Sequence, residues 1–289
     1  MPFLISSVKY TDKVYIGSIA AKLLVTLLAI SIPTCSYAGA WTQNKGNGQI
    51  ITNLSYYSSG KYFDNSGKKR STSNYSKYEV NPYMEYGVRD WLTIGANLFA
   101  QRSSQYNTGL GRQQTNWGIG DSELFFRTRL WNDKGLVISA EPMLKLPSID
   151  SRTEQPQIGN PNYDTGLTLS GGYSFKALEL DHFINIDAGY RHRFGAPKDQ
   201  LKFAATAGIS VTKRTKILTQ LFRTSRITDT GNTVFTQSSG DDYDLNKLQV
   251  SAVYQMDDKL SFQLGAYNNI SGRNTGSGDG ALLAVSKEF

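Results

Sequence analysis

Apolar and polar residues alternate with a period of two along most of the chain after residue 40. In one such segment, the residues that share a face are all apolar: Leu92, Ile94, Ala96, Leu98 and Ala100. The residues between them are mostly small or polar. Because successive side chains of a β-strand point to opposite faces, this alternation predicts strands that separate two environments.

Twelve segments of this kind follow one another: roughly 48–57, 75–86, 91–102, 118–131, 136–147, 165–175, 183–194, 200–211, 216–226, 246–255, 260–269 and 280–289. The segment 216–226 alternates poorly. Pro82 and Pro142 lie within strands where they remove an N–H donor, so we expect a bulge or kink at each. Twelve is the preferred count, and ten or fourteen strands stay open.

The connections between the segments distinguish a soluble β-sandwich from a membrane barrel. Four are tight turns: Gly87–Asp90, Asn132–Gly135, Thr212–Thr215 and Met256–Lys259. The connections between these turns are mostly longer and polar: 58–74, 103–116, 148–163, 228–244 and 271–279. The brief link Gly195–Asp199 is an exception. Alternating short and long connections are typical of periplasmic turns and extracellular loops in outer-membrane barrels.

Aromatic residues occur where the two interfaces of a membrane are expected. Trp91 and Trp131 adjoin short turns, whereas Tyr56 and Trp117 lie toward the long loops. The chain ends in Phe289, as do substrates of the bacterial barrel-assembly machinery. We therefore expect an all-β, transmembrane, antiparallel up-and-down barrel in the bacterial outer membrane, with both termini periplasmic. Its expected partners are outer-membrane lipid, lipopolysaccharide and the assembly machinery.

Residues 1–40 have the pattern of a cleaved signal peptide. Lysines precede the apolar run Leu23–Ile32, Pro33 ends it, and Ala38–Ala40 provides the small residues of a cleavage site. The run is too short to span a bilayer as a helix, which takes roughly 20 residues. The sequence thus predicts a signal peptide at 1–40 and the barrel at 41–289.

Composition argues against catalysis, metal binding and nucleic-acid binding. The formal net charge is +7 and the basic residues are not clustered, as nucleic-acid binding would require. Cys35, the single cysteine, lies within the predicted signal peptide. His192 has lipid-facing parity, like the histidine of outer-membrane phospholipases, but no matching serine motif accompanies it. His182 is expected in a solvated turn. We predict a protein that is not an enzyme and has no catalytic residue, cofactor or metal.

Charged residues on the polar faces are expected to line the lumen. They are Glu79, Glu85, Asp121, Glu123, Arg127, Arg129, Glu141, Lys145, Asp187, Arg191, Arg193 and Lys202. They could form a salt-bridged structural interior or the selectivity lining of a pore. Since an unpaired charge in a narrow interior is costly, we expect Arg127 or Arg129 to contact Glu123, Glu141 or Asp187.

Three aromatic residues with lumenal parity, Tyr83, Phe99 and Phe125, could form a track for stacking sugars or could fill space. The function predicted is transport or export of a polar solute, such as a saccharide or exopolysaccharide, through a charged lumen. The alternative is a structural or adhesive surface barrel with a closed lumen.

The stretches Gly39–Gln49 (GAWTQNKGNGQ) and Tyr78–Gly87 (YEVNPYMEYG) resemble those of XagA-type outer-membrane proteins. The start of the strand at Gly118–Glu123 (GIGDSE) is similar to one in that group and in the MetA-pathway phenol-degradation barrels. The motifs that carry the resemblance are structural, and none is catalytic. XagA-type proteins are associated with exopolysaccharide and biofilm loci, so the resemblance implies a polysaccharide-export or surface role, with a polysaccharide as partner.

Overall fold

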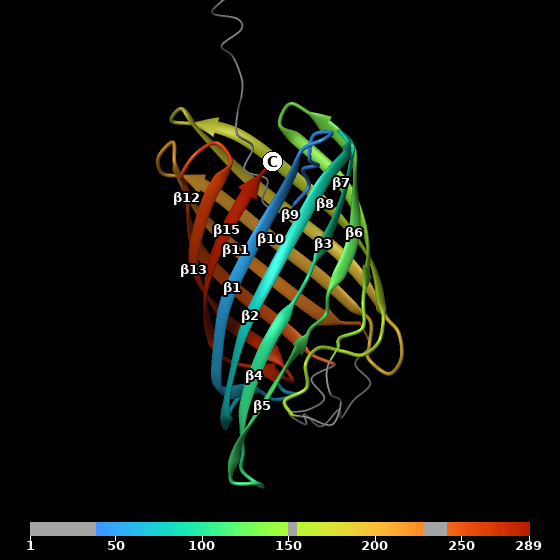
Figure 1. Cartoon of the computed structure of the whole chain (residues 1–289), viewed down its shortest axis with the longest axis vertical. Coiled ribbons are helices and arrows are strands. Elements are labelled where there is room, and N and C mark those ends of the chain that lie inside the picture. Colours follow the sequence, from blue (N-terminus) through green and yellow to red (C-terminus); the bar gives the residue numbers. More distant parts are fainter. Residues whose placement is uncertain (1–38, 150–154, 228–241) are drawn as a thin grey trace, which may run out of the picture. The chain divides into compact units, whose positions relative to one another are not determined.

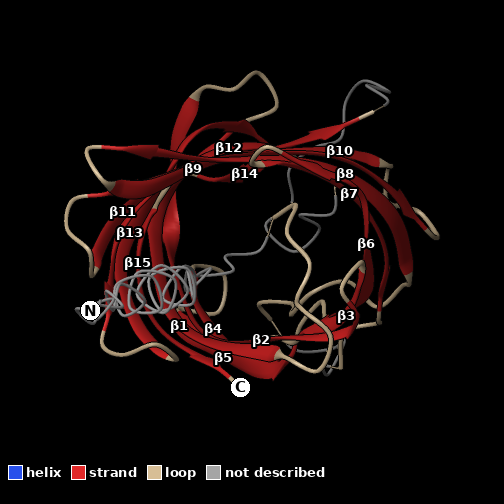
Figure 2. Ribbon diagram, turned by 90° about the horizontal axis from the view of Figure 1, so that it is seen from above, coloured by secondary structure: helices blue, strands red, loops and turns tan. Residues whose placement is uncertain are grey.

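The protein is a closed antiparallel β-barrel (Figures 1 and 2). The computed structural model describes residues 39–149, 155–227 and 242–289. Its strands are β1 (Gly48–Phe63), β2 (Lys69–Arg89), β3 (Leu92–Asn97), β4 (Ala100–Asn107), β5 (Arg112–Ile119), β6 (Glu123–Asp133), β7 (Leu136–Lys145), β8 (Asp164–Ala177), β9 (Leu180–Arg193), β10 (Gln200–Ser210), β11 (Thr215–Arg226), β12 (Asp244–Gln255), β13 (Leu260–Arg273), β14 (Thr275–Gly276) and β15 (Asp279–Glu288).

The ring contains twelve wall strands, as the alternation predicted. It closes because β1 pairs with both β2 and β15, and every neighbouring pair is antiparallel. β3 and β4 together form one wall strand, β5 and β6 form another, and β14 only extends the pairing of β1. A closed ring satisfies the backbone hydrogen bonds of every strand within the protein, as a bilayer requires.

Each proline noted in the sequence lies at a local interruption of the strand pairing. Pro82 is opposite the gap between β3 and β4, where its carbonyl accepts a bond from Leu98 N at 2.9 Å. Pro142 is opposite Phe126 and Arg127, where the pairing of β6 with β7 is interrupted. The prolines therefore interrupt the ladder locally because they offer no N–H to the neighbouring strand.

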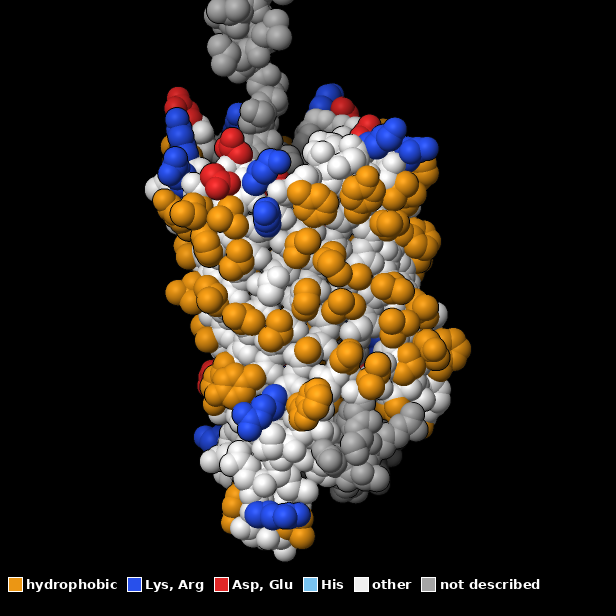
Figure 3. Space-filling model, in the orientation of Figure 1, with side chains coloured by type: hydrophobic (Ala, Val, Ile, Leu, Met, Phe, Trp, Pro, Cys, Tyr) orange, Lys and Arg blue, Asp and Glu red, His pale blue; other side chains and the backbone are white. Residues whose placement is uncertain are grey.

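Apolar side chains cover the outward face of the barrel (Figure 3). The band lies between two more polar ends, as expected for a wall that faces lipid. Trp91 and Trp131 are half exposed at the end of the short turns, and Tyr56, Tyr78 and Trp117 lie toward the other end. We call these the short-turn end and the loop end. Among the described residues, no helix is long and apolar enough to cross a membrane.

Two segments predicted as long loops, 58–74 and 103–116, are instead paired strands. β1 runs to Phe63 and β2 starts at Lys69, and β4 pairs with β5 along its whole length (Figure 1). Their Ser, Thr and Tyr residues pair well across strands without needing lipid on either side. In the tight turn, hydrogen bonds from Ser66 and Arg70 hold the pKa of Asp64 well below its usual range.

The solvated turn predicted for His182 is wrong. His182 is buried within β9, where its ring stacks on Phe175 at 5.4 Å and Nδ1 accepts a bond from Ser210 N at 3.2 Å. The strand starts earlier than the alternation suggested because Leu178 and Glu179 adopt positive φ and complete the turn before it. Residues 1–38 and 228–241, which include the signal-peptide region and most of one predicted loop, lie outside the described residues and those predictions stand untested.

Candidate functional site in the barrel lumen

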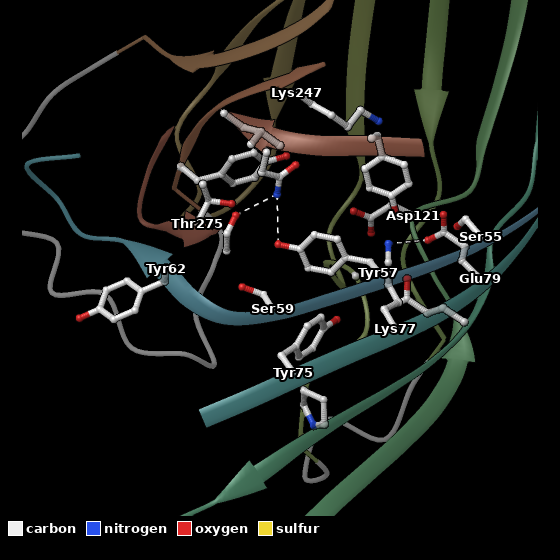
Figure 4. A pocket seen from close by; sticks show the side chains of 18 of the residues that line it. Ser55, Tyr57, Ser59, Tyr62, Tyr75, Lys77, Glu79, Asp121, Lys247 and Thr275 are labelled. Carbon is white, nitrogen blue, oxygen red and sulfur yellow. Dashed lines mark hydrogen bonds and ion pairs between the residues drawn. The ribbon is translucent and has the colours of Figure 1, made fainter. Parts of the chain in front are cut away.

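A cavity of about 560 Å³ lies inside the barrel toward the loop end, and we call it the outer cavity. Its wall comes mainly from β1, β2, β9, β12 and β13. Figure 4 shows Tyr57, Tyr75, Lys77, Glu79 and Lys247 around this space. A pocket of this size accommodates a small ring compound or a sugar unit.

Three tyrosines from separate strands form the aromatic part of the outer cavity. The rings of Tyr57 and Tyr267 are parallel within 1° with centroids 6.3 Å apart, and Tyr75 is tilted against Tyr57 at 6.2 Å. The Tyr57 hydroxyl accepts a hydrogen bond from Asn269 Nδ2 at 3.2 Å. This arrangement offers flat apolar surfaces next to polar atoms, which is the combination that sugar rings contact.

Charged side chains line the same cavity. Lys77 Nζ pairs with Glu79 at 2.8 Å, and Asp164 lies between Arg191 at 3.6 Å and Arg193 at 3.8 Å. These pairs place both signs of charge along the wall, so the interior is polar where the exterior is apolar.

A connection between β7 and β8 folds into the lumen and lines part of the outer cavity. We call residues 155–163 the infolded loop. Ile158 is fully buried, and Asn160 N donates to Asp121 Oδ1 at 2.7 Å. The fully buried Lys145 donates to the carbonyls of Asn160 at 2.6 Å and Asn162 at 2.7 Å. This part of the long connection predicted at 148–163 folds inward because a buried ammonium binds its carbonyls.

Nearer the short-turn end, Arg127 is the centre of a buried ion-pair cluster. Its guanidinium contacts Glu85 at 2.7 Å and Glu141 at 2.6 Å, and donates to the Tyr83 hydroxyl at 3.2 Å. The contact between Arg127 and Glu141 predicted from the hairpin register is confirmed. The planar guanidinium can bridge two carboxylates at once, which lowers the cost of burying all three charges.

The segment 39–47, which we call the N-terminal plug, crosses the lumen at the short-turn end (Figure 2). At one side Ala40 N donates to Asn185 Oδ1 of β9 at 3.0 Å. At the other, Gln43 donates through its backbone N to Thr93 Oγ1 and through Nε2 to Glu85, both at 2.8 Å. These contacts tie opposite walls together and narrow the passage.

An apolar cluster anchors the N-terminal plug. The Trp41 ring packs edge-on against Phe183 at 5.6 Å, next to buried Leu218 and Val253. A Cβ at Gly172 would lie 2.6 Å from the Trp41 ring, so only glycine leaves room for it. Arg127 also donates to the Trp41 carbonyl at 3.0 Å, which connects the plug to the ion-pair cluster.

The remaining charged residues predicted for the lumen occupy varied surroundings. Arg191 reaches from β9 to Glu123 on β6 and forms an ion pair there. Asp187 accepts a bond from Asn185 Nδ2 at 2.8 Å. Lys202 is half-buried. Arg129 is also half-buried, and it lies near the short-turn end next to a bulge in β6.

The predicted aromatic track is not continuous. Tyr83 and Phe125 stack on each other at 5.5 Å, and Arg127 lies over the Phe125 ring at 5.5 Å, so the protein itself occupies these faces. Phe99 lies in the gap between β3 and β4. Sequence reasoning missed Tyr57, Tyr75 and Tyr267, although all three share the inward parity of their strands. Their spacing along the chain gave no sign that they would meet.

Solved structures share this fold. An outer membrane channel from Pseudomonas putida F1 aligns with a TM-score of 0.67 at 16% identity, over 88% of this chain and 99% of its own. The KdgM porin gives a TM-score of 0.46 at 11% identity, covering 83% of this chain and 99% of its own. The translocator domain of the autotransporter NalP from Neisseria meningitidis gives 0.45 at 12%, covering 94% and 97%. No family model and no curated protein matches the chain. The fold is that of bacterial outer-membrane barrels.

Proposed function

We propose that this protein is an outer-membrane channel for a polar solute, with a saccharide as the solute class. The observation that carries the proposal is the outer cavity, a polar and aromatic space of about 560 Å³ inside a barrel whose outward face is apolar. The similar protein of P. putida is an outer membrane channel, which supports a transport role. The resemblance to XagA-type proteins supports a saccharide, and the loop end then faces the cell exterior.

For a solute to pass through the lumen, both the infolded loop and the N-terminal plug would have to move. The infolded loop lines the outer cavity, and the N-terminal plug crosses the lumen at the short-turn end. The plug is held by side-chain and turn hydrogen bonds and one aromatic anchor, and it is not a strand of the barrel wall. A segment outside the strand ladder opens more readily than the strands around it.

Liposome swelling tests this function. Vesicles that contain the purified barrel are placed in isotonic solutions of sugars of increasing size. We expect swelling with monosaccharides, and a slower rate with each added sugar unit because the lumen is narrow. Vesicles that swell no faster than protein-free vesicles with any sugar contradict transport.

A structural or adhesive surface barrel is the second candidate, favoured by the β4–β5 hairpin, which extends beyond the rest of the loop end (Figure 1). Tyr106 and Leu110 at this hairpin are exposed. A barrel that is silent in swelling assays, and whose hairpin deletion abolishes cell-surface adhesion, would have this role instead.

A further inference from the structure

Lys247 differs from the charged groups of the outer cavity that form ion pairs. The carboxylates that the described residues contribute to its lining, Glu79, Asp121 and Asp164, are each paired with another cation. Within the same described part of the chain, no carboxylate pairs with Lys247, whose ammonium contacts aromatic rings. The cavity therefore has a positive charge that is available to a solute.

Aromatic rings hold the Lys247 ammonium in place. Its Nζ lies 4.4 Å from the centroid of Phe222 and 5.3 Å from that of Tyr267. Cation–π attraction of this kind orients an ammonium without neutralising its charge. The Tyr267 ring is parallel to Tyr57, so the cation and the flat aromatic surfaces occupy one region of the cavity.

Neutral polar groups surround the same region. Asn269 Nδ2 donates to the Tyr57 hydroxyl at 3.2 Å and to the Gly276 carbonyl at 2.8 Å. Hydroxyl and amide groups can exchange hydrogen bonds with the hydroxyls of a sugar. A neutral sugar would use the rings and these groups but leave Lys247 without a counter-charge.

Building on the proposed transport function, we propose that the outer cavity binds saccharides that carry a carboxylate. The carboxylate pairs with Lys247, and the apolar face of the sugar ring packs against the aromatic cluster of Tyr57, Tyr75 and Tyr267. An aromatic acid would satisfy the cation and the rings but would form no additional hydrogen bonds with the hydroxyl and amide groups around Tyr57. The acidic sugar is the one class that uses all three features.

Isothermal titration calorimetry of the detergent-solubilised barrel tests the proposal with trigalacturonate, neutral maltotriose and benzoate as probes. We expect trigalacturonate to bind at least tenfold more tightly than either of the others, since a charge-assisted hydrogen bond contributes about that factor. Equal affinity for maltotriose would overturn the role of the charge, and equal affinity for benzoate would overturn the sugar class. This comparison needs no variant.

Variants then locate the site. Lys247→Gln should weaken trigalacturonate binding about tenfold and leave maltotriose binding unchanged, whereas Lys247→Arg should retain the preference. Lys61→Gln removes an equal charge from the same cavity, and since the Lys61 ammonium lies over no ring among the described residues, this change should have a much smaller effect. Equal losses of trigalacturonate affinity in Lys247→Gln and Lys61→Gln would show that the total positive charge of the cavity, and not a site at Lys247, attracts the ligand. This result would overturn the proposal. Heat-modifiable gel migration shows that each variant is folded.

The binding assay is independent of transport. Swelling with neutral and acidic sugars alike, without any binding preference, contradicts the acidic-sugar site and leaves the channel function standing. Selective binding by a barrel that never permits swelling supports the site and contradicts the channel function.

Discussion

Substitution of Arg127 by Met should destabilise the barrel strongly. The change removes the guanidinium that pairs with Glu85 and Glu141, whose carboxylates then lose their cation in the interior. The exposed fraction of the side chain is 4% for Arg127 and 1% for Glu85, so water cannot replace the lost pair. Breaking a buried ion pair by removing one partner costs about 3–5 kcal/mol. For a barrel of this size, a loss of that order lowers Tm by roughly 6–20 °C.

The loss can be measured by thermal melting of the purified barrel in detergent, followed by heat-modifiable gel migration. Arg129→Met is the matched control, because Arg129 lies on the same strand and is only half-buried. The control should stay within about 1 kcal/mol of the wild type. Adding Glu85→Gln and Glu141→Gln to Arg127→Met should restore part of the stability, since all three charges of this cluster are then gone. An Arg127→Met barrel that melts with the control would refute the account of the cluster.

Three further predictions concern the loops and the plug. Lys145→Met should release the infolded loop, which limited proteolysis would detect as cleavage in 155–163 at least fivefold faster than in the wild type; unchanged cleavage would contradict the role of Lys145. Burial alone would raise the pKa of Asp199, but hydrogen bonds, led by that from the Tyr190 hydroxyl, lower it to about 2. Because the folded pKa lies below the unfolded value of 3.8, these bonds stabilise the fold above that pH and are lost as pH falls toward 2. Melts between pH 5 and pH 2 should therefore lose stability more steeply in the wild type than in Asp199→Asn, and parallel curves would exclude this linkage. Gly172→Leu should push Trp41 aside and increase sugar-driven swelling, whereas unaltered swelling would show that the plug does not limit passage.

The wall of the barrel could be predicted from the sequence because one face of every strand must match lipid. That requirement fixes the parity of residues such as Leu92 and Arg127, and with it the strand order and the hairpin contact to Glu141. The same reasoning failed at 58–74 and 103–116. Outside the membrane no apolar face is required, so polar strand pairs and loops have similar sequences.

The filling of the lumen could not be predicted from the sequence. Neither the plug nor the infolded loop has a periodic pattern, and their positions depend on single contacts such as that of Lys145 with Asn160. Tyr57 and Tyr75 of the outer cavity meet in the hairpin of β1 and β2, and only barrel closure through β15 brings Tyr267 of β13 to them. Parity predicted which side chains point inward, but not at which level along the axis each lies.

Single-channel recording in a planar bilayer tests the central claim most directly, using the wild type and a variant that lacks residues 41–47. β1 begins after this segment, so the deletion removes the plug without shortening a wall strand. If the lumen is a solute path narrowed by the plug, the deletion variant should show current steps several times larger than those of the wild type. A deletion variant that inserts as a folded barrel and carries no current would show that the lumen is closed, and would contradict the channel function.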